Sequence, residues 1–179
     1  GSARREDTDL LLPRAELGQL LPEPAANWLS SHGAKLQFGK RISHIAPDQN
    51  GISIDGEIFS SAILATAPQH AAILWPELTI NDDFEPIATV YLQFGPKISL
   101  AFPLLNLLGK HGQWVVDRSN GLLACVLSGH GDWEALDDAA LTASLEDELG
   151  FPEKAHWHRV VREKRATFSA RPALYRPLC

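Results

Sequence analysis

The chain has 179 residues, of which 45% are hydrophobic and 21% are charged, and its formal net charge is -6. This composition is typical of a soluble globular protein with a sizeable core, and the acidic balance argues against a nucleic-acid partner, which requires a surplus of Lys and Arg. The sequence has neither a signal peptide nor an apolar run of the roughly 20 residues that a spanning helix needs, so we expect a cytoplasmic protein.

Two helices are expected near the N-terminus. Leu17, Leu20 and Leu21 share one face of a short first helix. Pro22 and Pro24 then open a second helix, because proline is well tolerated where the first-turn N–H groups have no partner. Gly33 ends this helix in the left-handed conformation that glycine adopts easily.

Residues 35–59 predict a small antiparallel meander. Asn50-Gly51 and Asp55-Gly56 are strong hairpin turns on either side of the strand 52–54, and further strands are expected over 35–38 and 42–45. The run 61–66 is apolar on both faces, which indicates a strand buried inside a parallel sheet.

The second half begins with a helix that starts at Pro68 and continues over 69–75. Residues 87–94 then form the longest strand pattern, with apolar side chains on both faces, so each face needs a cover. Five elements complete the expected order: strands over 98–102, 114–117, 122–127 and 157–168, and a helix that begins at Asp137 or Asp138, carries Leu141, Leu145 and Leu149, and ends at Gly150. Residues 103–109 are expected to form an apolar loop or helical turn.

Isolated motifs for catalysis or metal binding are weak. His156 and His158 alternate on one strand and His130 precedes them, but a surface strand explains them better than a metal site. Ser128 lacks the strand-to-helix glycine setting of an activated nucleophile. Cys125 lies in an apolar run, so we expect a core thiol rather than a disulfide with Cys179.

Several motifs, taken in order, resemble one enzyme family: Leu10-Leu11-Leu12-Pro13-Arg14-Ala15-Glu16-Leu17, Leu21-Pro22-Glu23-Pro24-Ala25, Gly39-Lys40-Arg41-Ile42, Gln113-Trp114-Val115-Val116-Asp117-Arg118 and Arg162-Glu163-Lys164-Arg165-Ala166-Thr167-Phe168. The chain is similar to the FAD-dependent amine oxidase and phytoene desaturase superfamily, and within it to the squalene-associated branch, the hydroxysqualene dehydroxylases. The resemblance covers nearly the whole chain.

The resemblance implies that FAD is the cofactor of the full-length protein. It places the adenine near Ile42, with Arg41 beside it, and the adenosine near Thr66 and Ala67. The Gly-x-Gly-x-x-Gly turn that receives the pyrophosphate in this family is absent from the sequence, and so is the family's closing FAD segment. The chain is therefore expected to be a middle fragment that binds no FAD by itself.

The resemblance also implies a hydrophobic isoprenoid substrate and contact with a membrane surface. A squalene-like hydrocarbon must be bound through apolar area in a long pocket, and the strands named above would supply its wall. The candidate wall residues are Tyr91, Leu92, Phe94, Trp114 and Val116. Ordinary sheet core remains the alternative for each of them.

The expected fold class is α+β. Residues 9–67 would be part of a Rossmann-like FAD-binding domain, and residues 68–179 a substrate-binding domain with a mixed, mainly antiparallel sheet flanked by helices. The expected reaction is hydride exchange between FAD and an allylic carbon, converting hydroxysqualene to squalene. A carotenoid-type desaturase or a flavin amine oxidase is the alternative within the class, and a noncatalytic lipid-binding module is the alternative outside it.

Overall fold

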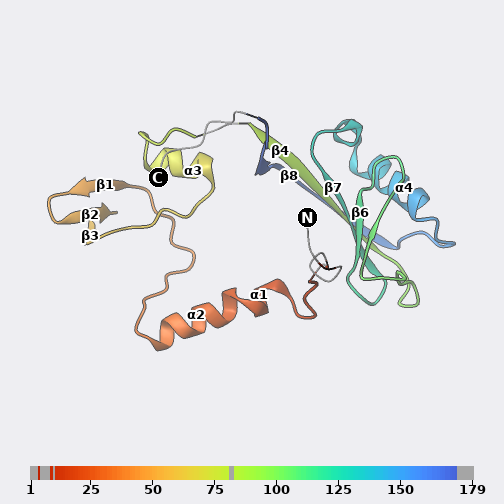
Figure 1. Ribbon diagram of the computed structural model, residues 1–179, viewed down its shortest axis with the longest axis horizontal. Helices are drawn as coiled ribbons and strands as arrows, with labels where there is room; N and C mark the ends of the chain where they lie inside the picture. Colours follow the sequence, from red (N-terminus) through yellow and green to blue (C-terminus); the bar gives the residue numbers. More distant parts are fainter. Residues whose placement is uncertain (1–3, 5–8, 10, 81–82, 173–179) are drawn as a thin grey trace. The chain divides into compact units, whose positions relative to one another are not determined.

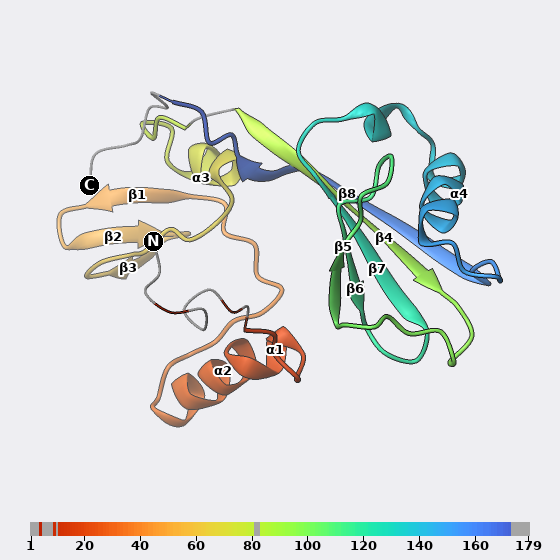
Figure 2. The same cartoon turned by 45° about the vertical axis from the view of Figure 1, so that its right-hand side comes forward.

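The computed structural model describes residues 4, 9, 11–80 and 83–172 (Figures 1 and 2). Its contacts divide the chain into an N-terminal unit, Gly1–Ile63, and a C-terminal unit, Leu64–Cys179. Each unit combines helices with its own antiparallel sheet, which confirms the α+β class. Among the described residues, no helix has the length and apolar character needed to cross a bilayer.

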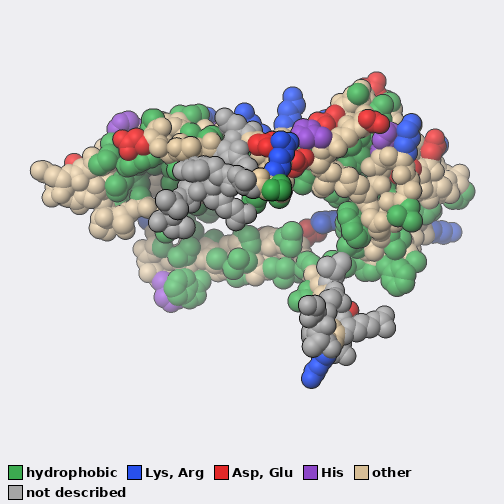
Figure 3. Space-filling view, turned by 45° about the horizontal axis from the view of Figure 1, so that its top comes forward, with side chains coloured by type: hydrophobic (Ala, Val, Ile, Leu, Met, Phe, Trp, Pro, Cys, Tyr) green, Lys and Arg blue, Asp and Glu red, His purple; other side chains and the backbone are tan. Residues whose placement is uncertain are grey.

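The helices of the N-terminal unit are α1 (Leu17–Leu20) and α2 (Pro22–Ser31). The predicted start of α2 is confirmed, and Gly33 follows it with a φ of 83°. Neither helix contains a buried residue, and Trp28 is 59% exposed. Figure 3 shows a largely hydrophobic row of side chains over these helices. Their apolar side chains are thus not part of a core within this unit.

The sheet of the N-terminal unit is the expected meander of β1 (Ile45–Asp48), β2 (Gly51–Ile54) and β3 (Glu57–Phe59). Asp55 and Gly56 both have positive φ angles in the β2–β3 turn, as the tight hairpin requires. Gly51, the first residue of β2, has a φ angle of 141°. A side chain is also excluded there, because a Cβ atom would collide with the carbonyl oxygen of Phe59.

Two strand predictions in this unit were wrong. Residues 35–38 form no strand, and Phe38 is 85% exposed. Strand β1 begins at Ile45, where the prediction of 42–45 ended. The reason is local: the Asp55 carboxylate accepts the backbone N–H groups of Ser43 (3.1 Å) and His44 (2.9 Å), so ladder pairing starts only at Ile45 opposite Ile54.

The predicted buried strand over 61–66 is also wrong for this structure. The segment is irregular and exposed, and Ile63 is 95% exposed. A strand buried in a parallel sheet needs hydrogen-bonding neighbours on both sides. Among the described strands, none pairs with these residues.

The C-terminal unit holds one five-stranded sheet with the order β5-β6-β7-β4-β8 (Figure 2). Its strands are β4 (Phe84–Gln93), β5 (Leu104–Asn106), β6 (Trp114–Asp117), β7 (Leu122–Ser128) and β8 (Trp157–Phe168). Its helices are α3 (Pro68–Leu74), the short 3-10 helix η2 (Asp132–Ala135) and α4 (Asp138–Leu149). Every pairing among the described strands is antiparallel, so within them the sheet is antiparallel and not mixed as predicted.

The core of this unit lies between the sheet and α4. Leu141 and Leu145 are completely buried against β4 and β7 residues such as Val90 and Leu123, and Leu149 packs at the edge of the same cluster. The predicted ends of α4 are confirmed: the Asp137 side chain accepts the backbone N–H of Ala140, and Gly150 ends the helix in the left-handed conformation.

The pairing of β4 with β8 contains a bulge opposite Pro86. Ile87 pairs with Glu163, but Glu85 pairs with Thr167, so β8 has extra residues at this point. Proline has no N–H to donate to the ladder, which explains why the register breaks here. The Glu163 carboxylate accepts the backbone N–H of Arg165 (2.9 Å) inside the bulge.

One strand prediction in the C-terminal unit was wrong. Residues 98–102 form no strand, because the N–H of Ile98 closes a turn to Gly95 and the N–H of Leu100 bonds to the Asp117 carboxylate (2.8 Å). The edge strand β5 instead lies within 103–109, which was expected to be loop or helical turn, and Leu104 pairs there with Val116.

The packing of α4 generates a stability prediction. Leu145→Ala should lower the free energy of unfolding by about 2–5 kcal/mol, because it leaves a cavity under the helix. Urea unfolding followed by tryptophan fluorescence measures this change. The matched control is Leu108→Ala, which removes the same atoms from a side chain that is 95% exposed and should cost less than about 0.5 kcal/mol. Equal losses for the two variants would contradict the assignment of the core.

Candidate functional site

The candidate site is the face of the five-stranded sheet opposite α4, which we call the open face. Paired residues of an antiparallel sheet point to the same side, so the register identifies its members. One row across the sheet joins Tyr91 of β4 to Ala124 of β7, then to Val116 of β6 and Leu104 of β5. This row consists mainly of apolar side chains.

A second row runs parallel to the first. It joins Val161 of β8 to Thr89, then to Val126 and Trp114. Trp114 is 42% exposed and Val161 is 44% exposed, whereas Val90 and Cys125 on the α4 side are completely buried. On the open face Ala124 is 5% exposed between larger side chains, and Tyr91 and Val116 are half-buried. Within the described residues of the C-terminal unit, the open face is therefore only partly covered, whereas the core residues of the α4 face are completely buried.

The five predicted wall residues fall on two different faces. Tyr91, Trp114 and Val116 lie on the open face, in the rows described above. Leu92 and Phe94 point to the opposite side and are 0% and 1% exposed in the core under α4. Strand alternation separates them, because Leu92 is the immediate neighbour of Tyr91. Only the first three side chains are accessible to a ligand in this unit.

The polar side chains of the open face are of two kinds. Gln93 donates to the carbonyl oxygens of Phe94 and Asn120, both at 2.9 Å, and Asn106 donates to that of Gln113 at 2.7 Å. By contrast, the Thr89 hydroxyl, the Tyr91 hydroxyl and the Arg159 guanidinium have no hydrogen bond or ion pair with any described residue. Sequence analysis did not single out Thr89 or Arg159, since only the register reveals that they lie beside Tyr91.

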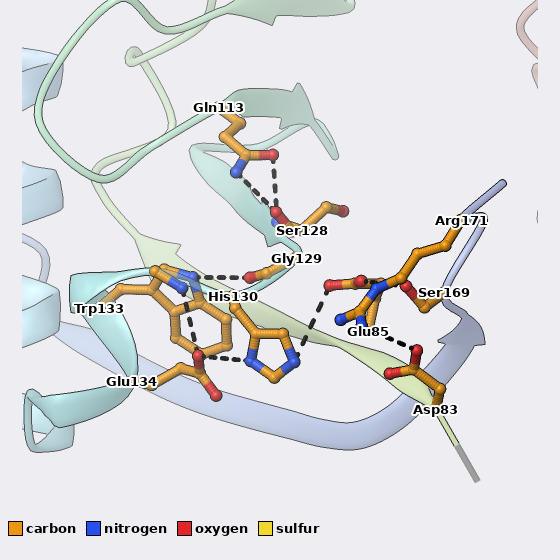
Figure 4. Close-up of polar contacts among 11 residues, drawn as sticks. Asp83, Glu85, Gln113, Ser128, Gly129, His130, Trp133, Glu134, Ser169 and Arg171 are labelled. Atoms are coloured by element: carbon orange, nitrogen blue, oxygen red, sulfur yellow. Dashed lines mark hydrogen bonds and ion pairs between the residues drawn. The ribbon is translucent and has the colours of Figure 1, made fainter.

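A cluster of charged side chains lies where β4 begins and β8 ends (Figures 3 and 4). His130 Nδ1 lies 3.0 Å from Glu134 Oε1, and its Nε2 lies 3.9 Å from Glu85 Oε2. Glu85 also accepts the Ser169 hydroxyl at 2.8 Å. Arg171 is paired with Asp83 at 3.3 Å. These contacts connect η2 and the residues after β8 to the start of β4.

The contacts of this cluster join β4, η2 and the residues after β8 to one another. No group of His, Cys, Asp and Glu within the described part of the chain could hold a metal ion. The backbone of Ser128 is held by the Gln113 side chain, at 2.8 Å and 3.1 Å, and no described contact links the Ser128 hydroxyl to His130. Ser128 is the last residue of strand β7.

Cys125 is a free thiol in the core, as expected. Burial raises its pKa to about 12, and the negative charge of Glu148 contributes less. Glu148 itself is held by the backbone N–H groups of His111 (2.7 Å) and Gly112 (3.0 Å). The thiol is thus kept protonated and inert. Cys179 lies outside the described residues.

The predicted cofactor residues lie in irregular segments. Arg41 is exposed and Ile42 half-buried immediately before the amides that Asp55 holds, and no described hydrogen bond involves the Ile42 backbone. Thr66 and Ala67 are exposed, and the Ala67 carbonyl accepts the first backbone hydrogen bonds of α3. The fold assigns these four residues no packing role that excludes ligand contact.

No protein-family model matches the chain, but two curated proteins are similar to it. A hydroxysqualene dehydroxylase of Rhodopseudomonas palustris is 28% identical over an alignment of 179 positions, which covers 91% of this chain and 42% of that protein. A hydroxysqualene dehydroxylase of Sinorhizobium fredii is 27% identical over an alignment of 174 positions, which covers 90% and 41%. The chain therefore spans about two fifths of the length of the curated relatives it matches.

These similarities confirm the resemblance that the motifs indicated. The relatives carry the name of the squalene-associated branch, and the matched region extends over both units of this chain. Their names identify them as enzymes of hydroxysqualene dehydroxylation.

The charged cluster generates a titration prediction. The hydrogen bond to Glu134 raises the pKa of His130 above its ordinary value of about 6.5, and the charge of Glu85 acts in the same direction. The pairing of protonated His130 with Glu134 therefore stabilises the folded protein fully below the pKa that His130 has in the unfolded state. This contribution is lost as the pH rises through the pKa that His130 has in the folded state. An NMR titration should show this elevated pKa, and Glu134→Gln should lower it.

The matched control for this titration is Glu57→Gln, which neutralises an exposed carboxylate on β3 of the N-terminal unit. It should leave the pKa of His130 unchanged. An unshifted His130 in the unsubstituted chain, or equal effects of the two substitutions, would show that the described pairing does not persist in solution.

Proposed function

We propose that this chain is a segment of a flavin-dependent oxidoreductase that acts on a polyprenyl lipid of the squalene type. The observation that carries the proposal is the similarity of about 90% of the chain to two hydroxysqualene dehydroxylases. In this proposal the N-terminal unit contributes to an FAD-binding domain, and the C-terminal unit forms the substrate-binding domain.

The open face supports the proposal that the C-terminal unit binds the lipid substrate. A squalene-type chain offers almost no polar atoms, so its binding free energy must come from buried apolar area, at about 25 cal/mol per Å². Tyr91, Trp114 and Val116 present such area beside the small side chain of Ala124. Trp114 is 42% exposed and Tyr91 and Val116 are half-buried, so these three side chains retain apolar area that a ligand could cover, unlike the completely buried residues under α4.

The irregular segments that hold the predicted cofactor residues, 41–42 in the N-terminal unit and 66–67 at the start of the C-terminal unit, are compatible with the proposal of an FAD cofactor. The backbone of Ile42 has no described hydrogen-bonding partner, and Asp55 holds the two following amides in place. Ile42 and Arg41 would lie at the adenine, and Thr66 and Ala67 at the adenosine. When bound, FAD would supply the hydride chemistry, while this chain's residues would orient the lipid and keep water away from it.

Some of the same observations also fit two other classes of function. A carotenoid-type desaturase or an amine oxidase would use the same cofactor residues, and a noncatalytic lipid-binding module would use the open face without any flavin. The coding sequence upstream of this segment separates the classes: a Gly-x-Gly-x-x-Gly turn between a strand and a helix supports the oxidoreductase, and a reading frame without it supports the binding module.

The proposal generates a paired substitution experiment in the full-length enzyme. Trp114→Asp or Tyr91→Asp puts a charge where the hydrocarbon would lie, so turnover should fall by a factor of roughly ten or more, equivalent to at least 1.4 kcal/mol in the barrier. The thermal midpoint should move by only a few degrees, because the side chains are partly solvated already.

Val115→Asp is the matched control, since it puts the same charge on the neighbouring residue of β6, which is completely buried. It should unfold the C-terminal unit, because an unpaired charge in the core costs several kcal/mol. If Trp114→Asp and Tyr91→Asp both unfold the protein as well, or both keep full turnover, the open face is not a substrate wall.

A further inference from the structure

Three polar groups without a described partner lie together on the open face. Tyr91 of β4 is directly opposite Arg159 of β8 in the register, and Thr89 is two residues from Tyr91 on the same side of β4. Directly opposite residues of an antiparallel pair have Cβ atoms roughly 4.5–5.5 Å apart. The phenol and guanidinium can therefore reach one and the same ligand atom.

The surroundings of this group are apolar. Val161 is opposite Thr89 on β8, Val126 is opposite it on β7, and Ala124 is opposite Tyr91. Elsewhere on this face, Gln93 and Asn106 are satisfied by backbone carbonyl oxygens. The indole N–H groups of Trp114 and Trp157 and the Ser128 hydroxyl also have no described hydrogen bond, but they lie at other register positions of this face. Tyr91 and Arg159 are thus the two uncommitted donors that lie directly opposite each other in the register, with Thr89 beside them.

A pure hydrocarbon that covered this place would bury these donors without a partner, at a cost of about 1–3 kcal/mol for each group. A ligand oxygen at the same place would satisfy them, since a phenol and a guanidinium both donate to a hydroxyl oxygen. The site therefore favours a lipid that carries a hydroxyl group over a hydrocarbon of the same length.

We infer that Tyr91 and Arg159, with Thr89 beside them, form a hydroxyl-binding subsite that positions the alcohol group of a polyprenyl substrate on the open face. This inference rests on the proposed function, because it requires that a polyprenyl lipid lies on this face. It adds a site at which the alcohol is distinguished from the hydrocarbon, with Tyr91 and Arg159 as the groups that contact the oxygen.

The test compares two probes on the 179-residue chain. Geraniol is a short prenyl alcohol, and myrcene is a hydrocarbon of the same carbon count. Each is titrated into the chain while the backbone amide NMR signals of β4, β7 and β8 are followed, so that both the affinity and the location are measured. We expect geraniol to bind about fivefold more tightly than myrcene, as one net hydrogen bond predicts.

Two substitutions assign this preference to the subsite. Tyr91→Phe and Arg159→Met should each reduce the preference for geraniol, because geraniol loses a donor and myrcene no longer buries an unpaired one, so that myrcene binds more tightly. The matched control is Lys164→Met, which removes a positive charge from the same strand but lines the hollow beside Pro86 and Trp133. It should keep the preference. The amide spectrum of each variant shows at once whether the sheet is intact.

The outcomes distinguish a failure of the hydroxyl subsite from a failure of the proposed function. Equal affinities for the two probes, with shifts on the open face, would overturn the hydroxyl subsite and keep the lipid-binding face. A preference that survives both Tyr91→Phe and Arg159→Met would overturn the assignment of these residues. If neither probe shifts the open-face amides, the lipid-binding face itself is wrong, and the subsite fails with it.

Discussion

The packing of α4 on one face of the five-stranded sheet is the interaction on which the C-terminal unit depends. Leu141 and Leu145 lie against Val90, Leu92 and Leu123, and this contact completes the core. A single helix covers only one side of a sheet, and β4 has apolar side chains on both. Because α4 packs on the other side, Tyr91 and Val116 are only half-buried and Trp114 is 42% exposed among the described residues of this unit.

The elements governed by local signals were predicted well from the sequence. Helix α4 has a side-chain cap at Asp137, a regular leucine stripe and a glycine at its end, and all of these act within a few residues. The hairpin turn at Asp55-Gly56 is of the same kind, because both of its residues have positive φ angles. The first hairpin turns at residues 49–50, one residue earlier than the predicted Asn50-Gly51, since Gly51 already pairs with Asp48.

The elements that depend on distant partners were predicted poorly. Residues 61–66 have a strong apolar pattern, but a pattern cannot supply the neighbouring strands that would pair with it. Side-chain hydrogen bonds also compete with the backbone pairing of strands. The Asp55 carboxylate accepts the backbone N–H of His44 just before β1, and the Asp117 carboxylate accepts that of Leu100. The bulge opposite Pro86 likewise depends on which residue of β8 lies across from a proline, and this is a property of the pair.

The candidate site was predicted in part for the same reason. Apolar character alone could not separate Tyr91 from Leu92, because both lie in one strand of mixed apolar residues. The side on which α4 packs separates them, since it buries Leu92 and leaves Tyr91 on the open face. Arg159 becomes a candidate site residue only because the register places it opposite Tyr91, and no spacing in the sequence relates residues 91 and 159. A polar group on an apolar wall is therefore recognised by the register of the sheet, and the register depends on the packing of the whole unit.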